Sequence, residues 1–137
     1  MKIGTKGYQA EEEGGFKSMT QSILIVDDEE DSRRILRNIL SKEKYRVLDA
    51  ATGEEALRKV REEKPDLVLL DTKLPDMDGI EVCRQIKGIQ GLTVKVIVYT
   101  GYIDAVDVTR ARMAGADGYE AKTQDFAQLL SAVKKLI

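Results

Sequence analysis

Apolar residues gather in short runs along this chain of 137 residues, and the runs predict β-strands. Three nearly continuous runs rich in branched side chains lie at 23–26, 66–70 and 94–98, a pattern typical of strands covered on both faces. Two more mixed runs, at 45–48 and 118–121, are typical of edge strands. The pattern therefore predicts five strands.

Helical patterns separate these strands. Thr52 and Glu55 have the spacing of a capping box, which predicts the start of a helix at that point. Apolar stripes, the weakest of them at 104–114, predict further helices at 33–40, 80–86, 104–114 and 126–136. Five strands that alternate with five helices predict an α/β fold, with a parallel sheet, right-handed crossovers and helices on both faces.

The first residues lack this periodicity. An acidic run closed by two glycines occupies 11–15, and no apolar pattern precedes it. We interpret residues 1–20 as a flexible N-terminal extension, for which an expression-derived portion and a natural start at Met19 are one explanation. Residues 21–137 are predicted to form a single domain.

Composition excludes several classes of protein. With 42% hydrophobic and 34% charged residues and a net charge of −2, the chain fits a soluble domain without a nucleic-acid or membrane partner. No membrane span or export signal is found in the sequence. The absence of histidine excludes a Ser-His-Asp triad, a histidine metal ligand and a phosphohistidine of its own. The single cysteine, Cys83, is expected in the core and suits a cytoplasmic protein.

Polar residues follow four of the predicted strands: Asp27 and Asp28, Asp71, Thr100, and Lys122. We expect them to converge, because ligand sites in such sheets lie beyond the carboxyl ends of the strands. Two carboxylates about 4 Å apart repel by about 4 kcal/mol near a protein surface, so the cluster calls for a cation. Oxygen ligands without histidine or thiolate favour Mg²⁺, for which Mn²⁺ can substitute. Helix capping is the alternative, but it accounts poorly for an aspartate that ends an apolar strand.

The most specific motif is DTKLPDMDG, which runs from Asp71 to Gly79. Together with the acidic pair at 27–28, Thr100, the segment 115–119 and Lys122, it makes residues 21–137 resemble a response-regulator receiver domain. This domain is the phosphoacceptor module of two-component signalling. The resemblance implies a flavodoxin-like, doubly wound sheet of five parallel strands in the order 2-1-3-4-5. It also implies self-catalysed phosphorylation and slow autodephosphorylation, not a dedicated enzyme.

The resemblance assigns roles to the acidic residues. Asp71 would accept a phosphoryl group from a phosphohistidine on a sensor histidine kinase or a histidine phosphotransfer protein. Asp28, Asp71 and the backbone carbonyl of Lys73 are similar to the family's direct Mg²⁺ ligands, and Asp27 would act mainly through water. Phosphoryl transfer of this kind depends chiefly on positioning and on neutralising charge.

The resemblance also implies a switch. Lys122 would neutralise charge on the phosphoryl group, and Thr100 would donate a hydrogen bond to it. As Thr100 moves inward, Tyr119 would rotate into the space behind it. The surface formed by the last two predicted helices and the strand between them would then change, and a downstream protein or a second phosphorylated copy would bind there.

Two features depart from the family pattern. Thr123 stands where the family commonly has a proline, and a cis bond before a non-proline residue costs about 3 kcal/mol. We therefore expect a trans peptide between Lys122 and Thr123, and Thr123 is also a predicted N-cap for the final helix. Lys73 and Tyr102 occupy positions that tune the access of attacking water, and their size predicts slow loss of the phosphoryl group.

The sequence fits two other classes of phosphate-handling protein less well than a receiver domain. A haloacid-dehalogenase-like phosphatase would need an aspartate two residues after the nucleophile, where Lys73 stands. A flavodoxin-like or dinucleotide-binding module would need a phosphate-binding loop after the first strand, where residues 27–30 are all acidic. Two alternatives stay open: a degenerate receiver that binds partners without phosphorylation, and a receiver excised from a larger regulator.

Overall fold

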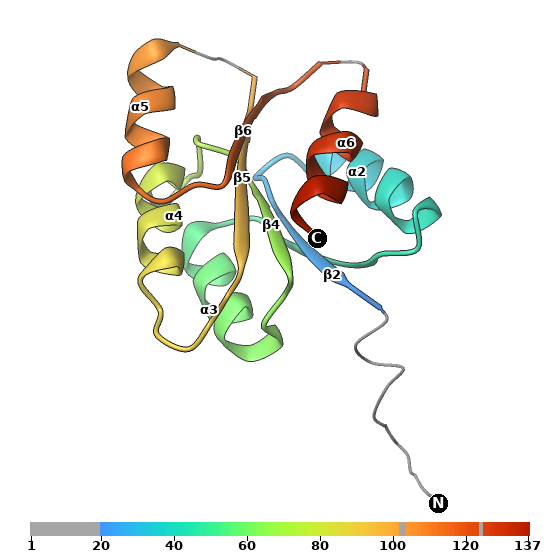
Figure 1. Ribbon diagram of the computed structural model, residues 1–137, viewed down its shortest axis with the longest axis horizontal. Coiled ribbons are helices and arrows are strands. Elements are labelled where there is room, and N and C mark those ends of the chain that lie inside the picture. The colour runs from blue at the N-terminus through green and yellow to red at the C-terminus, as the bar shows by residue number, and fades with distance from the viewer. Residues whose placement is uncertain (1–19, 102–103, 124) are drawn as a thin grey trace, which may run out of the picture.

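Strands and helices alternate in the computed structural model, which describes residues 20–101, 104–123 and 125–137 (Figure 1). The strands are β2 (Ser22–Val26), β3 (Arg46–Ala50), β4 (Leu67–Leu70), β5 (Lys95–Thr100) and β6 (Gly118–Ala121). The helices are α2 (Glu30–Lys42), α3 (Gly53–Glu63), α4 (Gly79–Lys87), α5 (Ala105–Met113) and α6 (Ala127–Leu136). The predicted extension up to residue 19, and Tyr102, lie outside the described residues.

The strands form one parallel sheet in the order β3-β2-β4-β5-β6, which is 2-1-3-4-5 when they are counted along the chain. This confirms the implied topology. Pairing places Val26 beside both Ala50 and Leu70, and it places Thr100 beside Ala121. Because this pairing continues, β3 and β5 extend past their predicted ends at 48 and 98. The carboxyl ends of all the strands lie along one edge of the sheet.

Helices cover both faces of the sheet, with α2 and α6 on one side and α3, α4 and α5 on the other (Figure 1). Alternate strand residues supply two apolar layers. Ile25 packs in one layer with Leu40 of α2 and Val133 of α6. Leu24 packs in the opposite layer with Ile86 of α4. Burying a side chain of this size stabilises the fold by about 1.5–3 kcal/mol, so the two layers hold the sheet from both sides.

The two predicted helix caps have different outcomes. Thr52 caps α3 as predicted, because its hydroxyl accepts a hydrogen bond from the amide of Glu55 at 3.0 Å. The prediction that Thr123 caps the final helix is wrong, since α6 begins only at Ala127. The carboxylate of Asp125 accepts from the amide of Ala127 at 3.0 Å, while Thr123 donates to the carbonyl of Asp125 at 2.9 Å. Phe126 occupies the N-cap position, and the carboxylate of Asp125 just before it pairs with the first amide of the helix.

The connection between β6 and α6 has the expected peptide geometry. No cis peptide bond occurs in the described part of the chain, so the bond between Lys122 and Thr123 is trans, as predicted. Within the same ranges, the helices are all too short or too polar to cross a membrane.

Candidate functional site

Three carboxylates meet at the carboxyl edge of the sheet. Asp27 follows β2 and its amide donates to Ala50 at 3.1 Å, while Asp71 follows β4 and its amide donates to Val26 at 2.9 Å. These bonds extend the strand pairing by one residue and hold both aspartates at the rim. Asp27, Asp28 and Asp71 each offer a carboxylate oxygen within 4.8 Å of the others. The predicted convergence of the acidic residues is therefore present.

Burial differs among the three acids. The side chains of Asp27 and Asp71 are largely buried, whereas Asp28 is exposed. The amide of Glu29 donates to Asp27 at 2.9 Å, and the amide of Lys73 lies 3.3 Å from Asp71. These amides satisfy part of the hydrogen-bonding capacity of each carboxylate but supply no full positive charge. A cation is still needed to offset the repulsion among the acids.

Lys122 provides one such charge. Its Nζ lies 2.6 Å from Oδ2 of Asp27 and 3.0 Å from Oδ2 of Asp71. Burial acts to lower the pKa of Lys122, but the hydrogen bonds to the two carboxylates outweigh it, and the pKa lies above its ordinary value. The ammonium also lies 5.8 Å from the centre of the Tyr99 ring. Lys122 is therefore a charged partner of the acidic cluster and not a solvated surface lysine.

A cavity of about 380 Å³ opens above these groups. It is lined by Asp28, Glu29, Asp71, Lys73, Thr100, Gly101 and Lys122. Thr100 is the last residue of β5. Its carbonyl accepts from the amide of Lys122 at 2.8 Å, and this bond keeps the ends of β5 and β6 together at the cavity. Carboxylates, a hydroxyl and an ammonium around one cavity can hold a hard cation and an anionic group side by side.

The loop after β4 packs closely against the cluster. The amide of Gly79 donates to the carbonyl of Thr72 at 2.9 Å. A Cβ atom on Gly79 would lie 2.0 Å from the carbonyl oxygen of Asp71, so any side chain at this position would displace the backbone of the aspartate. Glycine is required here by the close approach of the Asp71 backbone.

Thr72 is a neighbour of the site that sequence reasoning missed. Its Oγ1 lies 3.0 Å from Oγ1 of Thr100, so the hydroxyls of two different strand ends are hydrogen-bonded. The only sequence signal was its place directly after Asp71, which says nothing of a partner 28 residues away.

Tyr119 lies apart from the acidic cavity. Its side chain is half-buried on β6, and its hydroxyl is buried without a hydrogen-bond partner among the described residues. Burial raises the pKa of the phenol, and the negative charges of Asp107 and Asp104 raise it further. The ring lines a cavity together with Val108, Ala111 and Arg112 of α5. The rotation implied by the resemblance stays a prediction.

Asp76 is a second residue that sequence reasoning missed. One of its carboxylate oxygens accepts from the amide of Gly53 at 2.8 Å and the other accepts from the amide of Glu54 at 2.9 Å. These bonds lower the pKa of Asp76. The carboxylate of Glu55, predicted to complete the capping box, accepts instead from Ala51 at 2.9 Å. The loop after β4 is thus joined to the N-terminus of α3.

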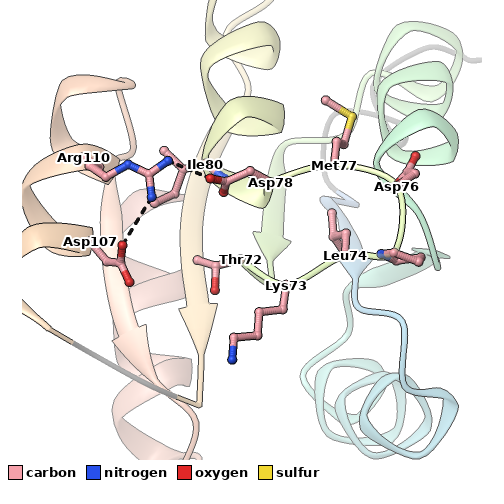
Figure 2. Close-up of a pocket in the computed structure, with 10 residues that line it drawn as sticks. Thr72, Lys73, Leu74, Asp76, Met77, Asp78, Ile80, Asp107 and Arg110 are labelled. Carbon is pink, nitrogen blue, oxygen red and sulfur yellow. Dashed lines mark hydrogen bonds and ion pairs between the residues drawn. The ribbon is translucent and has the colours of Figure 1, made fainter.

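A second cavity, of about 550 Å³, lies between this loop and α5. Figure 2 shows the guanidinium of Arg110 between Asp78 and Asp107, at 2.6 Å and 3.3 Å. Asp78 also caps α4, since it accepts from the amide of Ile80 at 2.9 Å. One arginine therefore links α5 to the loop that follows the acidic cluster.

Comparison with known proteins identifies relatives with the same arrangement of elements. Residues 23–134 match the family described as response regulator receiver domain. Sporulation initiation phosphotransferase F of Bacillus subtilis is 40% identical over 119 residues, which are 87% of this chain and 95% of that protein. Alkaline phosphatase synthesis transcriptional regulatory protein PhoP of the same organism is 39% identical over 119 residues, 87% of this chain. The chain spans only about half of that longer protein, 49%.

Solved structures agree with the sequence relatives. Response regulator protein TrrA of Thermotoga maritima, in complex with Mg²⁺-BeF, superposes with a TM-score of 0.79 at 36% identity. The match covers 86% of this chain and 100% of that one. A CheY-like response regulator receiver domain protein of Methanospirillum hungatei gives a TM-score of 0.80 at 36% identity, covering 85% and 92% of the two chains.

Proposed function

The chain belongs to the response regulator receiver domain family, and on this premise we propose that Asp71 accepts a phosphoryl group from a phosphohistidine of a partner protein. The partner would be a sensor histidine kinase or a histidine phosphotransfer protein, since this chain contains no histidine of its own. The observation that carries the proposal is the position of Asp71, which lies 3.0 Å from the Lys122 ammonium and beside two further carboxylates.

We assign a Mg²⁺ site to the same cluster. Asp28, Asp71 and the backbone carbonyl of Lys73 would hold the ion, and Asp27 would act through water. The three carboxylates fit such an ion, because their oxygens lie within 4.8 Å of one another and Mg²⁺ prefers oxygen ligands. When bound, the ion supplies positive charge that neutralises the transferred group. Mn²⁺ accepts the same ligands and would substitute.

The protein side chains supply the rest of the chemistry. A carboxylate oxygen of Asp71 attacks phosphorus, the phosphorus–nitrogen bond breaks with its electron pair on the imidazole, and an acyl phosphate forms. Lys122 pairs with the new negative charge, and the hydroxyl of Thr100 donates to a phosphoryl oxygen. Later attack by water on phosphorus restores the carboxylate and releases inorganic phosphate. Lys73, exposed beside Asp71, would slow the approach of that water.

The signal would be transmitted through the surface of α5, β6 and α6. Movement of Thr100 toward the phosphoryl group and rotation of Tyr119 would change the position of α5. That helix exposes 68% of Val106 and 83% of Met113 to solvent. Exposed apolar side chains of this size are suited to a downstream protein or to a second phosphorylated copy of the chain.

Incubation with Mg²⁺ and a small acyl-phosphate donor, followed by intact mass measurement, tests the proposal. The wild type should gain one phosphoryl group and Asp71→Asn should gain none. Asp31→Asn, an exposed aspartate in the first turn of α2, is the matched control and should react like the wild type. An adduct that persists in Asp71→Asn would contradict the proposal. A folded wild type that gains no phosphoryl group would favour the degenerate receiver instead.

A further inference from the structure

The hydrogen bond between Thr72 and Thr100 gives the proposed switch a restraint. Thr100 is only 3% exposed, and its Oγ1 lies 3.0 Å from Oγ1 of Thr72. Within the described ranges, Thr72 is the hydrogen-bond partner found for this hydroxyl. The pairing matters because a buried hydroxyl without a partner destabilises the state that contains it.

The two threonines belong to different cavities. Thr100 lines the acidic cavity, whereas Thr72 lines the neighbouring cavity beside α5, where Figure 2 shows it next to Lys73. The Thr100 hydroxyl therefore meets Thr72 at the boundary between the two cavities. It makes no hydrogen bond to Asp71 in the structure described, although both residues line the same space.

The backbones of both threonines are held in place. The carbonyl of Thr72 accepts from Gly79 at 2.9 Å, and the carbonyl of Thr100 accepts from Lys122 at 2.8 Å. A change of partner for the Thr100 hydroxyl must therefore come chiefly from rotation of its side chain. Either hydroxyl can donate in the resting pair. Rotation that brings Oγ1 of Thr100 to a phosphoryl oxygen would carry it away from Oγ1 of Thr72 and break the pair, whichever of the two donates.

We propose that Thr72 is a positioning residue that holds Thr100 in its resting orientation and so opposes engagement of the phosphoryl group. This inference rests on the proposed function of Asp71 and Thr100. The residue that sets this restraint comes directly after the acceptor, in the loop that follows β4. Its removal leaves the Thr100 hydroxyl unpaired in the resting state only, which shifts the equilibrium toward the engaged state.

Three variants of the full chain separate the hydroxyl from its surroundings. Thr72→Val keeps the shape of the side chain but removes the hydroxyl, whereas Thr72→Ser keeps the hydroxyl. Thr72→Ala also removes the hydroxyl but adds no methyl group, so it shows whether an effect of valine comes from packing. Each is titrated with beryllium fluoride in excess Mg²⁺, and the amide and methyl signals of Thr100 are followed by NMR. Beryllium fluoride forms a tetrahedral adduct on a carboxylate and so takes the place of a phosphoryl group.

The valine and alanine variants should bind beryllium fluoride about three- to tenfold more tightly than the wild type, as expected for loss of one resting-state hydrogen bond. Thr72→Ser should bind like the wild type. In the unliganded valine variant, the Thr100 methyl signal should move toward its position in the adduct. Equal or weaker binding by both valine and alanine variants would overturn the inference. If the wild type itself binds no more tightly than Asp71→Asn, the proposed function fails instead.

Discussion

Lys122 shares one ammonium between the carboxylates of Asp27 and Asp71, and both bonds are partly shielded from water. Removing the ammonium leaves two neighbouring acids at the rim without their counter-charge. Hydrogen bonds to charged groups in such positions are worth more than neutral ones. Lys122 therefore has a structural role in the resting protein in addition to its proposed role toward the phosphoryl group.

We predict that Lys122→Met lowers the free energy of unfolding by about 2 kcal/mol near pH 7. Because the folded pKa of Lys122 is above its ordinary value of 10.5, its contribution is complete below 10.5 and is lost as the pH rises through the folded pKa. The difference from the wild type should therefore shrink in that alkaline range. Urea titrations across the pH range measure it, with Lys135→Met on the exposed side of α6 as control. A difference independent of pH would refute the electrostatic explanation.

Cys83 of α4 is fully buried in one of the two apolar layers, as its helical spacing predicted. Burial raises the pKa of its thiol to about 11. Because the thiolate is the reactive form, we predict that iodoacetamide at pH 8 modifies the folded protein at least tenfold more slowly than the chain unfolded in guanidinium. Mass spectrometry over time measures both rates. Equal rates would show that the thiol is accessible in the folded state.

At the scale of helices and strands, Asp76 joins two elements that the sequence treats separately. Its carboxylate accepts from two amides at the start of α3, although it belongs to the loop after β4. We predict that Asp76→Ala lowers the free energy of unfolding by about 1 kcal/mol, the usual cost of losing a helix cap. Thermal or urea unfolding measures the loss, with Asp31→Ala as the exposed acidic control.

The pH dependence of this cap follows from its pKa. Since the folded pKa of Asp76 lies below its ordinary value of 3.8, the stabilisation is complete above 3.8 and is lost as the pH falls through the folded value. Wild type and Asp76→Ala should therefore become equally stable only in strong acid. A gap that persists there would mean that the side chain stabilises the loop by packing.

Elements with local patterns could be predicted from the sequence, whereas helix caps that come from distant elements could not. The strand at 118–121 and the cap at Thr52 follow from neighbouring residues and were found as expected. The carboxylate of Asp76 accepts from amides that lie 23 and 22 positions earlier in the chain, so no local spacing indicates this cap. Thr123 had the right residue type for a cap, but α6 is positioned by its packing on β2 and β5 and begins only after Phe126.

At the scale of the whole molecule, the acidic site follows from topology. Parallel strands in this order bring residues that follow different strands to one edge, which is why Asp27, Asp71 and Lys122 could be expected together. The hydrogen-bond partners of the residues next to this site depend on the orientation of individual side chains, which the topology does not fix. The bond between Thr72 and Thr100 is of that kind and had no signal in the sequence.

The acid cluster predicts a measurable response to magnesium. A ligand that binds only the folded state raises its stability, so millimolar Mg²⁺ should raise the melting temperature of the wild type by a few degrees. Asp28→Asn should abolish this rise, and without Mg²⁺ it should melt no lower than the wild type, because one repulsive charge is gone. Calorimetry with and without a chelator measures both effects. A rise that survives in Asp28→Asn would place the ion elsewhere.

The strand that ends just before Asp71, β4, is paired on both edges and packed on both faces. Because both neighbours hold this strand by hydrogen bonds, it cannot slide within the sheet. Phosphorylation of Asp71 therefore cannot act by shifting β4 against the other strands. The conformational change must instead involve the loops and the outer helices, whose local opening costs less free energy. Hydrogen exchange should therefore quicken or slow on α5 after modification, while the amides of β4 remain the last to exchange in either state.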